Sequence, residues 1–142
     1  MYLSLVSPFF SQTAYFNNSG VTDLSDITVS AGDSIRVTIA LLTTTSANVT
    51  IENLTNNKKV NEALTSGPVP FCSQYGLWFV DDATGPLFDF GTLTYTSALA
   101  SSNGTHYAPY GSDVSLVDMV QDGQTVATTS ISSENIIITY GS

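Results

Sequence analysis

The sequence is poor in positively charged side chains. Its 142 residues include 3 Lys and Arg against 12 Asp and Glu, which gives a formal net charge of -9. Affinity for nucleic acid comes mainly from Lys and Arg contacts to phosphates, so this balance excludes nucleic acid and anionic membrane surfaces as partners. No apolar run approaches the roughly 20 residues of a membrane-spanning helix, and we therefore expect no membrane insertion.

Cysteine and histidine are equally scarce, because Cys72 and His106 are the single examples of their kind. One cysteine cannot form an internal disulfide, and one imidazole excludes a two-histidine metal motif. We therefore expect no metal and no cofactor, and carboxylates, amides and hydroxyls remain as the groups for chemistry. The first ten residues carry no basic side chain and are interrupted by Pro8, a pattern that does not indicate a signal peptide.

The abundant residues favour strands. The chain is rich in Thr, Val, Ile, Tyr and Phe, which fit a pleated sheet, and poor in the residues that favour helices. Apolar and polar residues alternate strictly over residues 34–42 and again over 48–53, which is the period of a half-buried strand. Asn56-Asn57 and Asp122-Gly123 predict hairpin turns. A polar, Gly- and Ser-rich stretch over 100–112 predicts a long surface loop. We predict further strands at 58–64, 77–81, 87–96, 114–121, 125–132 and 135–140.

This pattern predicts an all-β fold. About ten strands with turn signals every eight to twelve residues favour an antiparallel β-sandwich of two stacked sheets. We see no internal repeat and no linker, so residues 1–142 are predicted to form a single domain.

Asp81 is the candidate catalytic residue. Asp81-Asp82 follows the apolar run 77–80, and strand alternation turns one carboxylate inward and its neighbour outward. Burial near Trp78 would raise the pKa of the inward carboxylate and suit it to general acid–base catalysis. The alternative is a strand that ends in a solvated acidic turn before Gly85-Pro86.

Two further sets of residues are candidates for sites. Aromatic rings can stack on sugars, and we take five of them as candidate binding residues: Tyr15, Phe16, Trp78, Tyr107 and Tyr110. Four Asn-x-Ser/Thr sequons are candidate glycosylation sites, at Asn17, Asn48, Asn53 and Asn103. The sequons matter only if the protein is secreted.

Five blocks of sequence occur in an order that is specific when they are taken together. They are DITVSAGDSI at 26–35, ENLT at 52–55, Cys72 followed by Trp78 and Asp81-Asp82, FDFGTLT at 88–94, and Asp122-Gly123. Together they resemble the eqolisins, the fungal glutamic peptidases, from about residue 23 to residue 140. The resemblance implies a sandwich of two highly curved antiparallel sheets, similar to concanavalin-like lectin sandwiches, and this agrees with the fold predicted from the alternation.

The resemblance also implies acid proteolysis, in which a Glu is the general base and a Gln amide stabilises the oxyanion. Asp81 stands at the position of that Glu and is one methylene shorter. A displacement of about 1 Å can cost on the order of 10²-fold in rate. The family's Gln lies upstream of the block that matches Ala14-Tyr15-Phe16, where this sequence has Gln12 without a family motif around it. The usual partner of the family's cysteine lies upstream too.

These departures favour a non-enzymatic, eqolisin-like, lectin-like fungal protein that binds a glycan or a cell-surface protein, of the effector or immunomodulatory type. The alternative is a residual acid endopeptidase with Asp81 as base and Gln74 or Gln121 as the amide. A third interpretation is one segment of a larger peptidase. The resemblance implies a secreted, extracellular protein.

Sheet edges left without neighbours must be covered, charged or paired, and this sequence has few charges to protect them. We therefore expect a homodimer.

Overall fold

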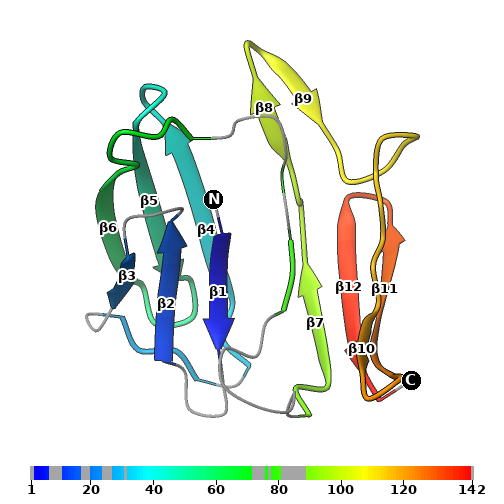
Figure 1. Ribbon diagram of the computed structural model, residues 1–142. Helices are drawn as coiled ribbons and strands as arrows, with labels where there is room; N and C mark the ends of the chain where they lie inside the picture. Colours follow the sequence, from blue (N-terminus) through cyan, green and yellow to red (C-terminus); the bar gives the residue numbers. More distant parts are fainter. Residues whose placement is uncertain are drawn as a thin grey trace. The chain divides into compact units, whose positions relative to one another are not determined.

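The computed structural model describes residues 2–6, 11–16, 20–23, 27–30, 32–71, 76, 78–80 and 89–141, with the backbone alone for residues 2–23. All the regular elements in these ranges are strands, and every pair of neighbouring strands is antiparallel (Figure 1). The predicted all-β antiparallel fold is therefore confirmed. The chain divides into two compact units, Met1–Leu77 and Trp78–Ser142. The single domain stays a prediction.

The first unit contains two three-stranded sheets, each formed by strands that follow one another in sequence. The first sheet has β1 (Tyr2–Val6), β2 (Ser11–Phe16) and β3 (Gly20–Asp23), and the second has β4 (Ile35–Leu41), β5 (Ser46–Asn53) and β6 (Lys58–Thr65). In the second sheet β5 lies between β4 and β6 (Figure 1). The strands predicted at 34–42, 48–53 and 58–64 are confirmed to within two residues.

One face of the β4-β5-β6 sheet is the core of the first unit. The register places Val37 opposite Ile51 and Ile51 opposite Val60, so the three side chains share a face. Val49 and Ile51 are fully buried and pack with Ile27 and Leu64. The inward orientation predicted for Val49 and Ile51 is confirmed.

Side-chain hydrogen bonds from Asn53 support the turn between β5 and β6. Asn57 adopts a φ of 60°, which asparagine tolerates better than most residues. The Oδ1 atom of Asn53 accepts hydrogen bonds from the backbone amides of Thr55 (3.0 Å) and Asn56 (3.3 Å). The predicted Asn56-Asn57 turn is therefore confirmed.

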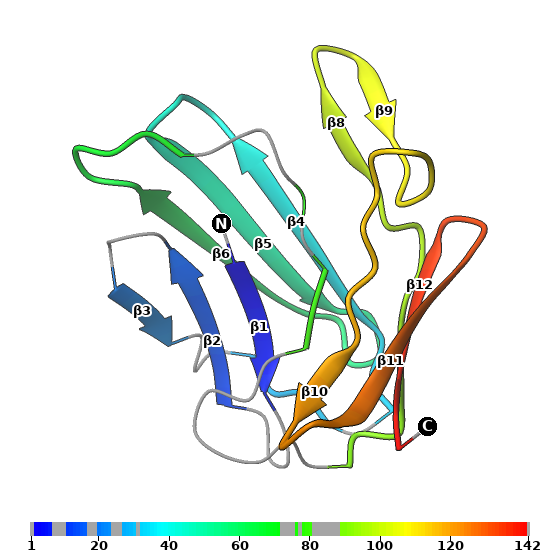
Figure 2. The same cartoon turned by 45° about the vertical axis from the view of Figure 1, so that its right-hand side comes forward.

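The second unit contains a four-stranded sheet in the order β10-β11-β12-β7 and a separate hairpin of β8 and β9 (Figure 2). The strands are β7 (Thr92–Tyr95), β8 (Ala100–Ser102), β9 (Thr105–Tyr107), β10 (Met119–Gln121), β11 (Gln124–Ser132) and β12 (Asn135–Tyr140). Four residues form the buried core of this unit: Ala98, Ala127, Ile136 and Ile138. Asp122 and Gly123 have φ values of 49° and 78°, which confirms their predicted hairpin turn.

The predicted loop at 100–112 is wrong in its first half, because β8 and β9 form a hairpin there. Asn103 and Gly104 have φ values of 50° and 78°, the left-handed pair of a tight hairpin turn. This Asn-Gly signal was present in the sequence and was hidden by the polar residues around it.

The strand predicted at 114–121 is too long, because β10 begins only at Met119. Before Met119, hydrogen bonds that involve side chains take the place of the backbone hydrogen bonds of a strand pair. The Oδ1 atom of Asp118 accepts a hydrogen bond from the amide of Thr129 (2.8 Å), and the Thr129 hydroxyl donates to the carbonyl of Val117 (3.2 Å). The register also shifts between Met119 and Val120.

Two other predicted strands are shortened or absent in the described chain. Of 87–96, only Thr92–Tyr95 is a strand among the described residues, and Gly91 before it has a φ of 67°. Of 77–81, the described residues 78–80 are not part of a β-strand. Residues 77, 81, 87 and 88 lie outside the described ranges.

Candidate active site

The segment that leads into Asp81 is held in the core of the second unit. Trp78 and Val80 are half-buried and pack against the cluster around Ile136 and Ile138. Between them, the carbonyl of Phe79 accepts a hydrogen bond of 2.8 Å from the Tyr95 hydroxyl. The chain is therefore fixed up to the residue before Asp81, and Asp81 and Asp82 themselves lie outside the described residues.

Tyr95 reaches this segment from β7, and the sequence analysis did not single it out. Burial raises the pKa of Tyr95 to about 12, because the phenolate would lose its solvation. The hydroxyl therefore stays a hydrogen-bond donor at acidic and neutral pH. Its place in an aromatic-rich predicted strand was the available signal, but the sequence could not show that its partner would be a backbone carbonyl.

The aromatic residues predicted to bind a ligand do not form one cluster in the described chain. Trp78 packs in the core, whereas Tyr107 and Tyr110 are 56% and 58% exposed and lie outside that hydrophobic cluster. Tyr15 and Phe16 end β2, where the backbone alone is described.

The other polar residues named in the sequence analysis, among them the two candidate amides, are only partly described. Cys72 and Gln74 lie outside the described residues, and Gln12 is in β2, where the backbone alone is described. Gln121 ends β10, is half-buried and lies opposite Gln124 in the hairpin. His106 is exposed in β9.

The four sequons have different environments. Asn48 is exposed on β5, and Asn103 is exposed at the turn between β8 and β9. Asn53 is 0% exposed, although it belongs to the same strand as Asn48. Asn17 lies outside the described residues.

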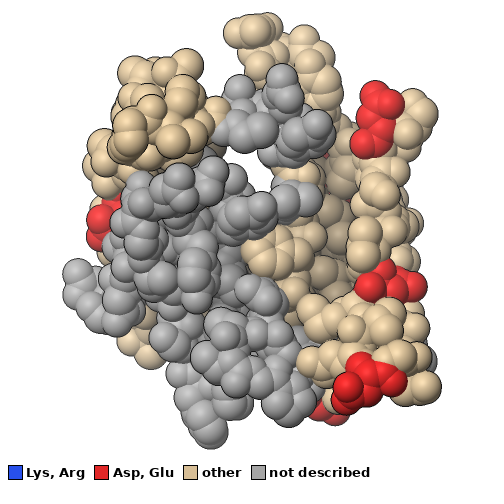
Figure 3. All heavy atoms as spheres, in the orientation of Figure 1, with Lys and Arg blue, Asp and Glu red and all other residues tan. Residues whose placement is uncertain are grey.

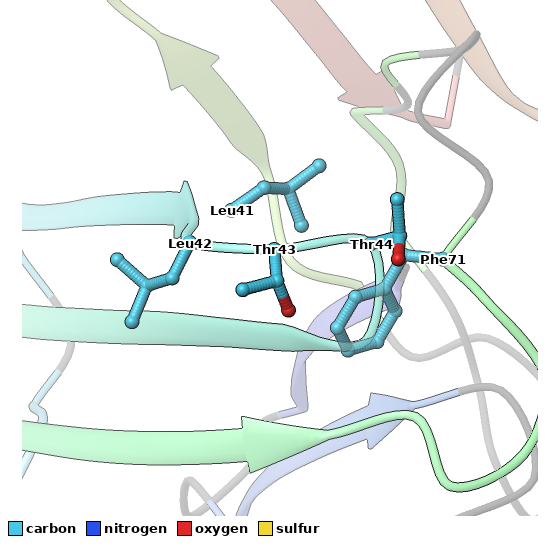
Figure 4. A pocket seen from close by; sticks show the side chains of 5 residues that line it. All are labelled: Leu41, Leu42, Thr43, Thr44 and Phe71. Atoms are coloured by element: carbon cyan, nitrogen blue, oxygen red, sulfur yellow. The ribbon is translucent and has the colours of Figure 1, made fainter.

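A shallow pocket lies at the end of β4, in the first unit. Its volume is about 160 Å³, and it is lined by Leu41, Leu42, Thr43, Thr44 and Phe71 (Figure 4). The amide of Phe71 donates a 2.7 Å hydrogen bond to the carbonyl of Thr44, which holds the ring beside the loop between β4 and β5. The pocket offers apolar side chains and two hydroxyls. It contains no titratable group and therefore no candidate acid or base.

Within the described ranges, no group of three or more His, Cys, Asp or Glu side chains is placed to hold a metal ion. The same residues include no helix with the length and apolarity to cross a membrane.

The sequence matches the model of the Peptidase A4 family over residues 8–140. The chain belongs to this family. The resemblance to the eqolisins, the glutamic peptidases, is therefore confirmed.

Two of the comparisons match a peptidase from Aspergillus niger. The chain is 38% identical to aspergillopepsin-2 over 125 residues, which is 83% of this chain and 43% of that protein. It therefore spans less than half the length of this relative. It also resembles the crystal structure of aspergilloglutamic peptidase with a TM-score of 0.83 at 32% identity, over 93% of this chain and 80% of that one.

A more distant match supports the fold alone. The structure of scytalido-glutamic peptidase with a peptide-based transition-state analogue matches with a TM-score of 0.72 at 19% identity, over 93% of this chain and 69% of that one.

These relatives correct the predicted function. The departures of the sequence from the eqolisin pattern predict a non-enzymatic binding protein with a glycan or cell-surface ligand, and this prediction is contradicted. The identity to aspergillopepsin-2 and to aspergilloglutamic peptidase favours the alternative, an acid endopeptidase. The prediction was wrong because it gave two departures, Asp81 in place of the Glu and the missing upstream Gln, more weight than the similarity of the whole chain.

Proposed function

We propose that this chain is an acid endopeptidase of the glutamic peptidase type, with Asp81 as the general base. One observation carries the proposal, namely the 38% identity to aspergillopepsin-2 over 83% of the chain. The spacing of Asp81 from Cys72 and Trp78, which matches that of the eqolisin Glu, supports the assignment.

The general base must take a proton from the water that attacks the peptide carbonyl, and it must lie within hydrogen-bonding distance of that water. A carboxylate does this in acid only if part of it stays ionised. Asp has an ordinary pKa of about 3.9, so activity is expected at about pH 3 to 4. The segment 78–80, which directly precedes Asp81 in the sequence, is anchored in the core of the second unit.

The Asp81 side chain is one methylene shorter than the family's Glu, which predicts a slow enzyme. The carboxylate has to act from about 1 Å farther away, at a cost on the order of 10²-fold in rate. Catalysis also needs a neutral donor for the oxyanion, and an amide supplies one whose charge does not change with pH. Gln121 and Gln74 are the candidates for this amide.

The test is cleavage of an unfolded protein substrate by the full chain at about pH 3 to 4, near the ordinary pKa of Asp. We expect slow cleavage that Asp81→Asn abolishes and that Asp81→Glu accelerates on the order of 10²-fold, because the carboxylate regains the family's reach. Asp113→Asn is the matched control, since Asp113 is exposed and its backbone is described.

Two results would contradict the proposal. The first is an inert wild type together with an inert Asp81→Glu protein. The second is cleavage that survives Asp81→Asn, which would come from another residue or a contaminant. If cleavage depends on Asp81, the variants Gln121→Ala and Gln74→Ala identify the amide. Loss of the oxyanion donor lowers kcat by about 10²-fold or more.

Acid chemistry on unfolded proteins suits an extracellular protein, and the Aspergillus niger relatives support a fungal setting. Secretion therefore forms part of this proposal. A homodimeric state is proposed separately, on the ground that uncovered sheet edges need a partner.

A further inference from the structure

The outer face of the β4-β5-β6 sheet is polar and exposed to solvent. Thr50 of β5 lies on this face, and its hydroxyl donates a 2.9 Å hydrogen bond to Oδ1 of Asn61 on β6. The next row across the face consists of Ala40, Asn48 and Ala63, which are neighbours in register and all exposed. Asn48 therefore has a methyl group on each side, and no large side chain on the neighbouring strands covers its amide.

The sequon Asn48-Val49-Thr50 matches the period of the strand. Asn48 and Thr50 are two residues apart and share the outer face, while Val49 between them is buried in the core. Both residues that define the sequon therefore lie on the polar face of the sheet.

Asn103 has a comparable exposure at the tip of a hairpin. It takes a left-handed φ of 50° beside Gly104, in the turn between β8 and β9. Asn103, Gly104 and Thr105 are all exposed. The sequon is therefore presented on an exposed hairpin turn.

Asn53 differs from both in burial and hydrogen bonding. It is 0% exposed, and its Nδ2 atom donates hydrogen bonds to the carbonyl of Thr28 (3.0 Å) and to Oδ2 of Asp33 (2.7 Å). An amide nitrogen has two hydrogens, and both are used here. A sugar on Nδ2 would remove one of these hydrogens and would need space that the packed interior does not have.

We propose that Asn48 and Asn103 carry N-linked glycans in the secreted protein and that Asn53 stays unmodified in the folded chain. The donor is an oligosaccharide joined to a polyprenyl pyrophosphate. Nδ2 attacks C1 of the first N-acetylglucosamine, the N–C1 bond forms, and the bond between C1 and the pyrophosphate oxygen breaks. The pyrophosphate leaves with the bonding electron pair, and Nδ2 loses one proton. The proposal depends on passage through a secretory pathway and is independent of catalysis.

The test is expression of the full chain in yeast behind a cleavable secretion leader, followed by release of the glycans with a glycosidase in ¹⁸O-water. This reaction converts each occupied Asn into Asp that carries the heavy isotope. We expect the label at Asn48 and Asn103 and unlabelled Asn at Asn53. Asn48→Gln and Thr105→Ala should each remove the mass of one glycan, and Thr105→Ala leaves the Asn103 turn intact.

Circular dichroism is the folding control, and each variant should keep the β-sheet spectrum of the wild type. If the chain is not exported, translation in the presence of microsomal membranes gives the same readout before export. The absence of sugar from Asn48 or from Asn103, or a labelled Asn53 in folded protein, would overturn the proposal.

Discussion

Asn48 and Asn53 occupy opposite environments on the strand β5. Asn53 is 0% exposed and accepts or donates four side-chain hydrogen bonds, whereas Asn48 is on the exposed face. Asn53→Ala removes four hydrogen bonds made by a fully buried side chain, so we expect it to lower the free energy of unfolding by about 2 to 4 kcal/mol. The matched change Asn48→Ala should cost less than about 0.5 kcal/mol. Urea denaturation measures both, and equal losses would contradict the description of the network.

The same network makes part of the stability dependent on acid. The amide of Ser30 and Nδ2 of Asn53 both donate to the Asp33 carboxylate, and these hydrogen bonds hold the pKa of Asp33 below its ordinary 3.8. A lowered pKa in the folded state stabilises the protein above the ordinary value, and the stabilisation is lost as the pH falls through the folded pKa.

We therefore expect the free-energy difference between wild type and Asp33→Asn to shrink steadily from about pH 5 to about pH 2. Urea denaturation across this range measures it. A difference that stays constant or grows toward acid would show that Asp33 is not held as the carboxylate.

At this scale the sequence was informative about turns and strand faces and uninformative about the hydrogen-bond partners of Asn53. Alternation places Asn53 on the inward face with Val49 and Ile51, and it places Asn48 on the outward face. Asn53 is buried because Thr28 and Asp33, from a segment far back in the chain, converge on its amide.

Alternation predicted the local elements well. In β4, β5 and β6 the type of each residue, apolar or polar, predicted the face of the sheet on which it lies. This works because one face is buried and the other is exposed to solvent. Prediction failed where a side chain replaced the sheet ladder. Asp118 and Thr129 take the hydrogen bonds that a longer β10 would use. The candidate site was predicted only in part, because the anchoring bond from Tyr95 to Phe79 joins segments that share no local pattern.

The hydrogen bond from the Tyr95 hydroxyl to the Phe79 carbonyl anchors the segment before Asp81, and it predicts a loss of stability at alkaline pH. The pKa of Tyr95 is raised to about 12, so the stabilisation is complete below the ordinary value of 10.0 and is lost as the pH rises toward the folded pKa. Wild type should be about 1 kcal/mol more stable than Tyr95→Phe at neutral pH, because of the hydrogen bond. We expect this advantage to fall by about 1.4 kcal/mol by about pH 11.

Urea denaturation at neutral pH and in alkali measures the change, and Tyr107→Phe is the control because Tyr107 is exposed. An advantage that persists unchanged in alkali would show that the Tyr95 hydroxyl is solvated.

At the scale of the whole molecule, the self-association expected from the sequence stays a prediction. Among the described strands, none pairs with the outer edge of β4, and Ile39 and Leu41 on β4 are 40% and 44% exposed. Charge protects an edge from pairing, and β4 carries Arg36 alone. On the face shown in Figure 3, the described residues present Asp and Glu and no Lys or Arg.

We expect analytical ultracentrifugation at about micromolar concentration to show a dimer, since a two-fold partner is the commonest way to cover such an edge. The substitution Ala40→Lys and the deletion of residues 1–10 should each weaken the association of the dimer. Ser101→Lys on β8 is the control for the added charge. A single species of 15.0 kDa for the wild type would contradict the prediction.

The two units differ in how far along the chain their strands find partners. β4, β5 and β6 pair in sequence order through short turns. In contrast, β7 pairs with β12, and Tyr95 lies opposite Ile136, far along the chain. Closing a long loop costs more conformational entropy, and this cost comes before the strand contacts that stabilise the pair have formed. Non-local pairing therefore slows folding. We expect pulsed hydrogen exchange to protect β5 amides before those of β7. The β4-β5-β6 sheet then forms early in refolding. The segment before Asp81 becomes fixed only after β12, the last strand, has paired with β7.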